Sequence, residues 1–184
     1  MIEFINVSLA FPDRKVLNNF SHKFKEKGII LITGASGSGK TTLTRLLLGL
    51  IKADSGTVDT NGAKFSAVFQ EDRLIPTLSA LENVELVCDT AEAEKRLSDL
   101  GLSDSLHLLP EELSGGMKRR VAIARALAFG GDVLVLDEAF NGINEDLARS
   151  IIEKIAEEYK DRLIIAVTHQ PELFSNYEYT EIKI

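Results

Sequence analysis

The stretch "GIILITGASGSGKTT", residues 28–42, decides the fold. It begins with an apolar run, typical of a strand that is buried on both faces, and continues as a glycine-rich loop before a helical pattern. The loop has the spacing Gly-x-x-x-x-Gly-Lys-Thr over residues 34–41. Strand, loop and helix in this order predict a phosphate-binding loop, because glycines let successive N–H groups face an anion at a helix start.

Each part of this loop has an expected role toward a nucleotide. Lys40 is expected to reach the β- and γ-phosphates, and Thr41 to supply a hydroxyl to Mg²⁺. The expected nucleotide-binding residues of the segment are Gly34, Ala35, Ser36, Gly37, Ser38, Gly39, Lys40, Thr41 and Thr42. The pattern predicts nucleotide binding but does not indicate which process nucleotide hydrolysis would drive.

Strands alternate with helices around the loop. Strands are expected over residues 2–9, 16–24, 28–33, 57–59, 64–69, 133–136, 162–168 and 177–184, and helices over 42–51 and 145–159. Pro12 and Asp13 mark a turn after the first strand. This alternation predicts an α/β fold with a mostly parallel sheet covered on both faces.

Residues 71–112 have a different character. Acidic residues, leucines and alanines recur there at a spacing of three to four, interrupted by Pro76, Gly101 and Pro110. This pattern predicts a small helical subdomain. We expect one domain over residues 1–184, with a core of residues 1–70 and 121–184 and a helical subdomain of residues 71–120.

A pair of carboxylates follows the expected strand over residues 133–136. We expect Asp137 to hold Mg²⁺ through water, and Glu138 to accept a proton from the attacking water or to orient it. A carboxylate pair after a strand is by itself more often a helix cap. The phosphate-binding loop in the same chain favours the catalytic interpretation.

The stretch "LSGGMKRR", residues 113–120, is a second helix start suited to an anion. It is not a second loop of the first kind, because no Gly-Lys-Ser/Thr follows. The chain carries, in order, the phosphate-binding loop, Gln70, the LSGG stretch, Asp137 with Glu138, and His169. In this order it resembles the ATP-binding cassette (ABC) ATPases, and the resemblance covers nearly the whole chain.

The resemblance implies a P-loop NTPase fold with an N-terminal antiparallel β subdomain and an inserted α-helical subdomain. In that family two chains pack head-to-tail with two ATP molecules between them. Ser114, Gly115 and Gly116 would therefore bind the γ-phosphate of ATP held by a second protomer, which is either an identical chain or a paralogue.

Three further residues take roles from the resemblance. Phe11 would stack on adenine, although a phenylalanine there also suits a core or an edge strand. Gln70 would sense Mg²⁺ and the attacking water, and a surface glutamine is its alternative. His169 would contact the γ-phosphate, where a lone histidine after a strand is otherwise structural. The implied catalytic set is Lys40, Gln70, Glu138 and His169, and the implied metal set is Thr41, Gln70 and Asp137.

The sequence departs from the family pattern at two positions. Met117 stands where glutamine is commonest, as in the importer ATPases for nitrate, sulfonate and taurine that this chain resembles. Asn144 stands where the family has an aspartate, so it keeps hydrogen-bonding capacity without the charge.

Composition limits the partners. A net charge of −7 argues against a nucleic-acid surface, and the single cysteine, Cys88, excludes an internal disulfide. No run of about 18 apolar residues is present and the start does not read as a signal peptide. We expect a cytoplasmic protein that reaches a membrane through a partner.

These features favour the nucleotide-binding subunit of an ABC transporter, which hydrolyses ATP beside a transmembrane permease on the cytoplasmic face of the membrane. A soluble ABC ATPase of DNA repair, chromosome organisation or translation is the alternative. A P-loop kinase would leave the LSGG stretch and His169 unexplained.

Overall fold

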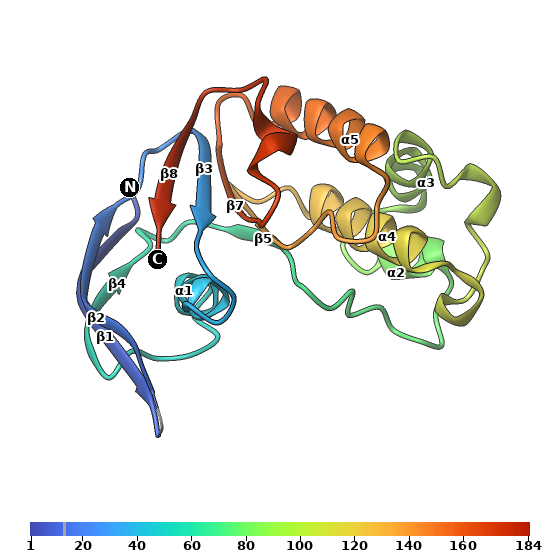
Figure 1. Cartoon of the computed structure of the whole chain (residues 1–184). Helices are drawn as coiled ribbons and strands as arrows, with labels where there is room; N and C mark the ends of the chain where they lie inside the picture. The colour runs from blue at the N-terminus through green and yellow to red at the C-terminus, as the bar shows by residue number, and fades with distance from the viewer. Residues whose placement is uncertain (13) are drawn as a thin grey trace.

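A computed structural model describes residues 1–12 and 14–184 (Figure 1). Within these residues the strands form two sheets. The parallel sheet has the order β5-β6-β7-β3-β8, with strands Phe65–Val68, Val133–Asp137, Leu163–Val167, Gly28–Thr33 and Tyr179–Lys183. The antiparallel sheet has the order β2-β1-β4, with strands Arg14–Lys23, Glu3–Phe11 and Ser55–Asp59. The predicted α/β fold is confirmed.

Helices cover both faces of the parallel sheet. The helix α1 (Lys40–Leu47) lies between the two sheets, while α4 (Gly115–Phe129) and α5 (Glu145–Glu158) lie on the far side of the parallel sheet (Figure 1). Short 3₁₀ helices occur at Ser103–Ser105, Pro110–Glu112 and Pro171–Phe174.

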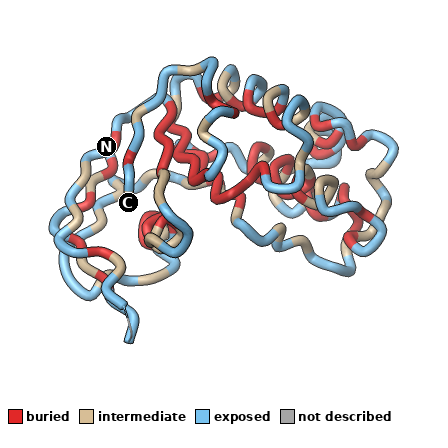
Figure 2. The backbone as a smooth tube through the Cα atoms, viewed as in Figure 1, coloured by how far each residue is buried: buried red, intermediate tan, exposed pale blue. Residues whose placement is uncertain are grey.

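The side chains of β3 show why two cores form. Successive side chains of a strand point to opposite faces of a sheet. Ile30 and Ile32 therefore pack in the core that contains α1 and the antiparallel sheet, whereas Ile29 and Leu31 pack in the core that contains α4 and α5. Figure 2 shows the buried residues running through the parallel sheet and along the facing sides of the helices.

The inserted segment is only partly helical. It contains α2 (Ala80–Glu85) and α3 (Thr90–Asp99), which pack on α4 in the second core. Ser79 begins α2 with a reciprocal cap, since its hydroxyl accepts from the Glu82 N–H at 3.2 Å and its N–H donates to the Glu82 carboxylate at 2.7 Å. The helix α4 continues unbroken across residue 120, where the division between helical subdomain and core is expected.

Several element ends differ from the expected ones. α1 begins at Lys40 and ends at Leu47 instead of spanning 42–51. It ends early because Gly49 adopts a φ of +68° and the Leu50 N–H turns back to the Arg45 carbonyl at 2.9 Å. β1 and β2 are longer than expected, since their pairing extends to Phe11 opposite Arg14. Asp13, part of the expected turn, lies outside the described residues.

Across the described ranges, every helix is too short or too polar to cross a bilayer.

Candidate nucleotide and catalytic site

The phosphate-binding loop joins β3 to α1, as its pattern predicts. Gly39 caps the helix at a φ of +116°, and a Cβ there would lie 2.4 Å from Cγ1 of Val16. Only glycine therefore fits between the loop and β2. The ammonium of Lys40 is buried and donates to the carbonyls of Gly34 and Ala35, both at 3.0 Å, so the loop curls around a positive charge at a helix N-terminus.

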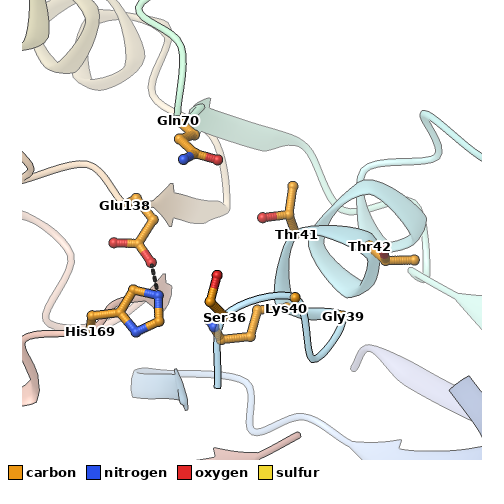
Figure 3. A pocket seen from close by; sticks show the side chains of 9 residues that line it. Ser36, Gly39, Lys40, Thr41, Thr42, Gln70, Glu138 and His169 are labelled. Carbon is orange, nitrogen blue, oxygen red and sulfur yellow. Dashed lines mark ion pairs between the residues drawn. The ribbon is translucent and has the colours of Figure 1, made fainter. Parts of the chain in front are cut away.

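A surface pocket of about 200 Å³ opens over this loop (Figure 3). Gln70 comes to it from the end of β5, Glu138 from the end of β6 and His169 from the segment after β7. All three strands are parallel, so their carboxyl ends meet at one edge of the sheet beside the loop. The lining consists of Ser36, Gly37, Gly39, Lys40, Thr41, Thr42, Gln70, Glu138 and His169.

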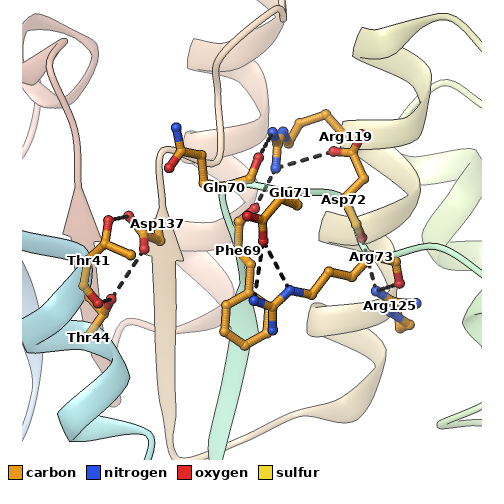
Figure 4. A network of polar contacts seen from close by, with 10 residues as sticks. All are labelled: Thr41, Thr44, Phe69, Gln70, Glu71, Asp72, Arg73, Arg119, Arg125 and Asp137. Carbon is orange, nitrogen blue, oxygen red and sulfur yellow. Dashed lines mark hydrogen bonds and ion pairs between the residues drawn. The ribbon is translucent and has the colours of Figure 1, made fainter. Parts of the chain in front are cut away.

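Asp137 is tied to α1 by two hydroxyl groups. Thr41 Oγ1 donates to one of its carboxylate oxygens at 3.4 Å, and Thr44 Oγ1 donates to the other at 3.2 Å (Figure 4). Burial raises the pKa of Asp137, while the hydrogen bonds from Thr44 and then Thr41 act in the opposite direction. The carboxylate is thus held against α1, next to Thr41 of the pocket lining.

Glu138 is held by two side chains. Its Oε1 lies 3.2 Å from Nε2 of His169, and its Oε2 accepts from Nδ2 of Asn141 at 3.2 Å. Glu138 has a φ of +53°, an uncommon conformation for a residue other than glycine, and its N–H donates to the carbonyl of Val167. The backbone turn thus aims a nearly buried carboxylate into the pocket, where it can accept a proton.

The LSGG stretch lies elsewhere on the surface. Ser114 caps α4, and its exposed hydroxyl accepts from the Met117 N–H at 3.3 Å. A Cβ at Gly116 would lie 2.9 Å from the carbonyl oxygen of Gly142, so the start of α4 packs closely on the loop that follows Glu138. In the described part of the chain, Ser114, Gly115 and Gly116 do not line the pocket over the phosphate-binding loop.

Comparisons with known proteins identify the family. A sequence profile described as "ABC transporter" matches residues 17–141 of the chain. The chain belongs to the ABC transporter family. It is 36% identical over 188 residues to the bicarbonate transport ATP-binding protein CmpD of Synechocystis sp., covering 89% of this chain and 67% of that protein. It is 32% identical to the putative hemin import ATP-binding protein HrtA of Staphylococcus aureus, covering 92% and 88%.

The solved structures agree. The ATP-binding cassette MJ0796, in a dimeric post-hydrolysis state bound to ADP and Pi, matches with a TM-score of 0.87 at 28% identity, over 99% of this chain and 96% of that one. The present chain is an ATP-hydrolysing subunit of an ABC transporter. The transporter interpretation is supported over the soluble alternative.

Phe11 is placed near the site but not in it. This side chain is 51% exposed at the end of β1, opposite Arg14. A Cβ at Gly37 would lie 3.1 Å from Nη1 of Arg14, so this end of the cassette's antiparallel sheet approaches the phosphate-binding loop. Stacking of Phe11 on adenine stays a prediction.

The structure adds residues that the sequence analysis did not single out. Thr44 follows Thr41 by one helical turn, and that spacing could have predicted that both hydroxyls face Asp137. Asn141 had no comparable signal, because its contact with Glu138 depends on how the loop turns back. Asn144 caps α5 by accepting from the N–H groups of Asp146 and Leu147, a contact that the aspartate of the family pattern would make equally well.

Proposed function

We propose that this cassette hydrolyses ATP in sites shared between two protomers. The observation that carries this proposal is the separation of the exposed start of α4 from the pocket over the phosphate-binding loop. Ser114, Gly115 and Gly116 then contact the γ-phosphate of ATP held by Lys40 of the second protomer. The second protomer is an identical chain or a paralogue, and each chain is a single domain with residues 71–120 as its helical subdomain.

Within each site the residues have separate tasks. Lys40 binds the β- and γ-phosphates, and the backbone of residues 34–42 surrounds them. Glu138 accepts the proton of the water that attacks the γ-phosphorus, as the bond from that phosphorus to the bridging oxygen breaks and ADP leaves. Gln70 orients this water, and His169 contacts the γ-phosphate. Phe11 stacks on the adenine ring.

The oxygen atoms of this site suit Mg²⁺. Thr41 and Asp137 supply a hydroxyl and a carboxylate oxygen that already lie together, and Mg²⁺ prefers such oxygen ligands, completed by substrate phosphates and water. The residues that would hold it are Thr41, Asp137 and Gln70. Bound there, Mg²⁺ would neutralise charge on the phosphate oxygens.

Closure and reopening of the dimer would drive a membrane partner. ATP bridges the protomers and therefore favours the closed state, and loss of the γ-phosphate removes that bridge. We place the cassette on the cytoplasmic face of the membrane, against a transmembrane permease docked near Gln70 and the helical subdomain.

The substitution Ser114→Arg tests the shared site. In each protomer it blocks the contact with the γ-phosphate of the partner's ATP, while the phosphate-binding loop of the same chain stays intact. The expected result is unchanged ATP binding by the isolated chain and loss of steady-state ATPase activity. Ser103→Arg, at an exposed serine of the same segment, is the matched control and keeps its activity. Wild-type turnover by the Ser114→Arg variant would contradict the shared site.

A further inference from the structure

The guanidinium of Arg119 binds the backbone of the segment that carries Gln70 (Figure 4). Arg119 lies on α4 and is only 7% exposed. Its Nη1 donates to the carbonyl of Phe69 at 2.6 Å, and its Nη2 donates to the carbonyl of Gln70 at 2.5 Å. Nη1 also lies 3.2 Å from a carboxylate oxygen of Asp72. The Arg119 side chain thus contacts three of the four residues in the segment 69–72.

Arginine is chemically suited to this position. The segment leaves β5 at Val68, so the carbonyls of Phe69 and Gln70 lie past the hydrogen bonds of the sheet. These carbonyls are partly buried and still require donors, and a planar guanidinium can satisfy two at once. The charge that this brings into the interior is paired by Asp72. The contacts therefore fix both the position and the orientation of the Gln70 peptide group.

The rest of the segment is also bound to α4. Nη2 of Arg125 donates to the carbonyls of Asp72 and Arg73, at 3.2 and 3.0 Å. Arg73 adopts a φ of +48° and its guanidinium stacks over the ring of Phe69 at 3.9 Å. Residues 69–73 are thus fastened along one helix, and Arg119 is the attachment next to Gln70.

We propose that Arg119 is a positioning residue for Gln70 in ATP hydrolysis. The Gln70 side chain faces the pocket, while its peptide group is held from behind by α4 (Figures 3 and 4). Fixing that peptide group fixes where the side-chain amide can reach, and errors of about 1 Å in such placement can lower rates about 100-fold. This inference rests on the role of Gln70 in the proposed function.

A consequence concerns the start of the same helix. α4 begins at Gly115, directly after Ser114, and contains Arg119 in its second turn. A displacement of α4 as a rigid body would therefore move the Gln70 peptide group with it. A contact of Ser114 with ATP in one site would therefore be transmitted by α4 and the side chain of Arg119 to Gln70 in the other site.

The test compares two arginines that each donate to two backbone carbonyls. Arg119→Gln removes the charge and one of the two carbonyl contacts. Arg162→Gln is the matched control, since Arg162 donates to the carbonyls of Gly131 and Glu158, away from Gln70. We expect Arg119→Gln to lower kcat about tenfold or more with KM for ATP unchanged. We expect Arg162→Gln to lower thermal stability and leave kcat unchanged.

A double-mutant cycle with Gln70→Ala shows whether Arg119 acts through Gln70. The expected result is that the double variant is no slower than Gln70→Ala alone. Losses that multiply, or an Arg119→Gln kcat equal to that of Arg162→Gln, would overturn the positioning role of Arg119 and leave the role of Gln70 standing. A wild-type kcat for Gln70→Ala would overturn both. If Arg119→Gln does not fold, Arg119→Lys, which keeps the charge but not the fork, is used in the same cycle.

Discussion

The carboxylate of Glu138 and the imidazole of His169 face each other, with Oε1 and Nε2 3.2 Å apart. The two residues follow β6 and β7, which pair in parallel with Asp137 opposite Val167. The register of two buried strands thus brings Glu138, the proposed general base, and His169, the proposed γ-phosphate contact, to one edge of the pocket. The side chain of Glu138 is 8% exposed and that of His169 is 51% exposed, so His169 is the partner that can turn toward a ligand.

His169→Gln tests this contact. The variant is expected to bind ATP normally and to lose activity by about 10²-fold or more, because both the phosphate contact and the partner of Glu138 are lost. Steady-state ATPase assays and ATP binding measure the two effects. His107→Gln, at an exposed histidine outside the site, is the control. Equal losses in the two variants would contradict a role for His169.

Gly39→Ala is expected to abolish ATP binding. The added methyl group would lie 2.4 Å from Val16 at a φ of +116°, so the loop must distort. Gly62→Ala is the control, because Gly62 also has a positive φ but its added methyl group would meet nothing within 4 Å. Measuring the melting temperature at increasing ATP concentrations distinguishes the two variants. Normal ATP binding by the Gly39→Ala variant would contradict the prediction, because the loop would then accommodate a methyl group beside Val16.

Asp137→Asn is expected to have opposite effects on the melting temperature with and without Mg-ATP. Burial raises the pKa of this carboxyl, which means that the folded chain holds the charged form less readily than the unfolded chain does. At neutral pH the neutral amide should therefore raise the melting temperature of the ligand-free protein. The same change should remove the extra stabilisation that Mg²⁺ adds to ATP.

Melting temperatures measured without ligand, with ATP plus EDTA and with Mg-ATP separate these effects. Asp104→Asn, at an exposed aspartate, should change neither the ligand-free melting temperature nor the stabilisation by Mg²⁺. A ligand-free Asp137→Asn protein that melts below the wild type would show that the hydroxyl contacts outweigh the cost of burial.

Glu158→Gln tests the attachment of the helical segment to the core. Glu158 on α5 pairs with Arg96 on α3, and their side chains are 27% and 16% exposed. Because this pair is largely shielded from water, its loss is expected to lower the free energy of unfolding by about 1–2 kcal/mol. Glu157→Gln, which removes the exposed pair with Lys160, should have little effect in the same urea titration. Equal effects would contradict a shielded tether.

The sequence predicted the parts of the site that depend on local pattern. The order strand, glycine loop, helix predicted the places of Lys40 and Thr41, and the carboxylate pair after an apolar strand predicted Glu138 as a site residue. His169 was expected in the site only from the resemblance to the ABC ATPases. The end of α1 was missed, since the leucines continue at helical spacing past Leu47 and only the conformation of Gly49 stops the helix.

Contacts between distant segments could not be predicted from one sequence. Arg119 belongs to a basic run, and nothing local indicates that its guanidinium turns inward to the carbonyls of Phe69 and Gln70. Similarly, the Asn141 contact with Glu138 depends on the turn of the loop between them. Such contacts follow from tertiary packing rather than from periodicity.

Light scattering on the Glu138→Gln variant, with and without Mg-ATP, tests the shared site most directly. The variant keeps every ATP contact but lacks the carboxylate that accepts the proton, so bound ATP is not discharged. The account predicts a monomer without nucleotide and a stable dimer with Mg-ATP, while the wild type forms no lasting dimer. A variant that binds Mg-ATP yet stays monomeric would contradict a site completed by a second copy of this chain.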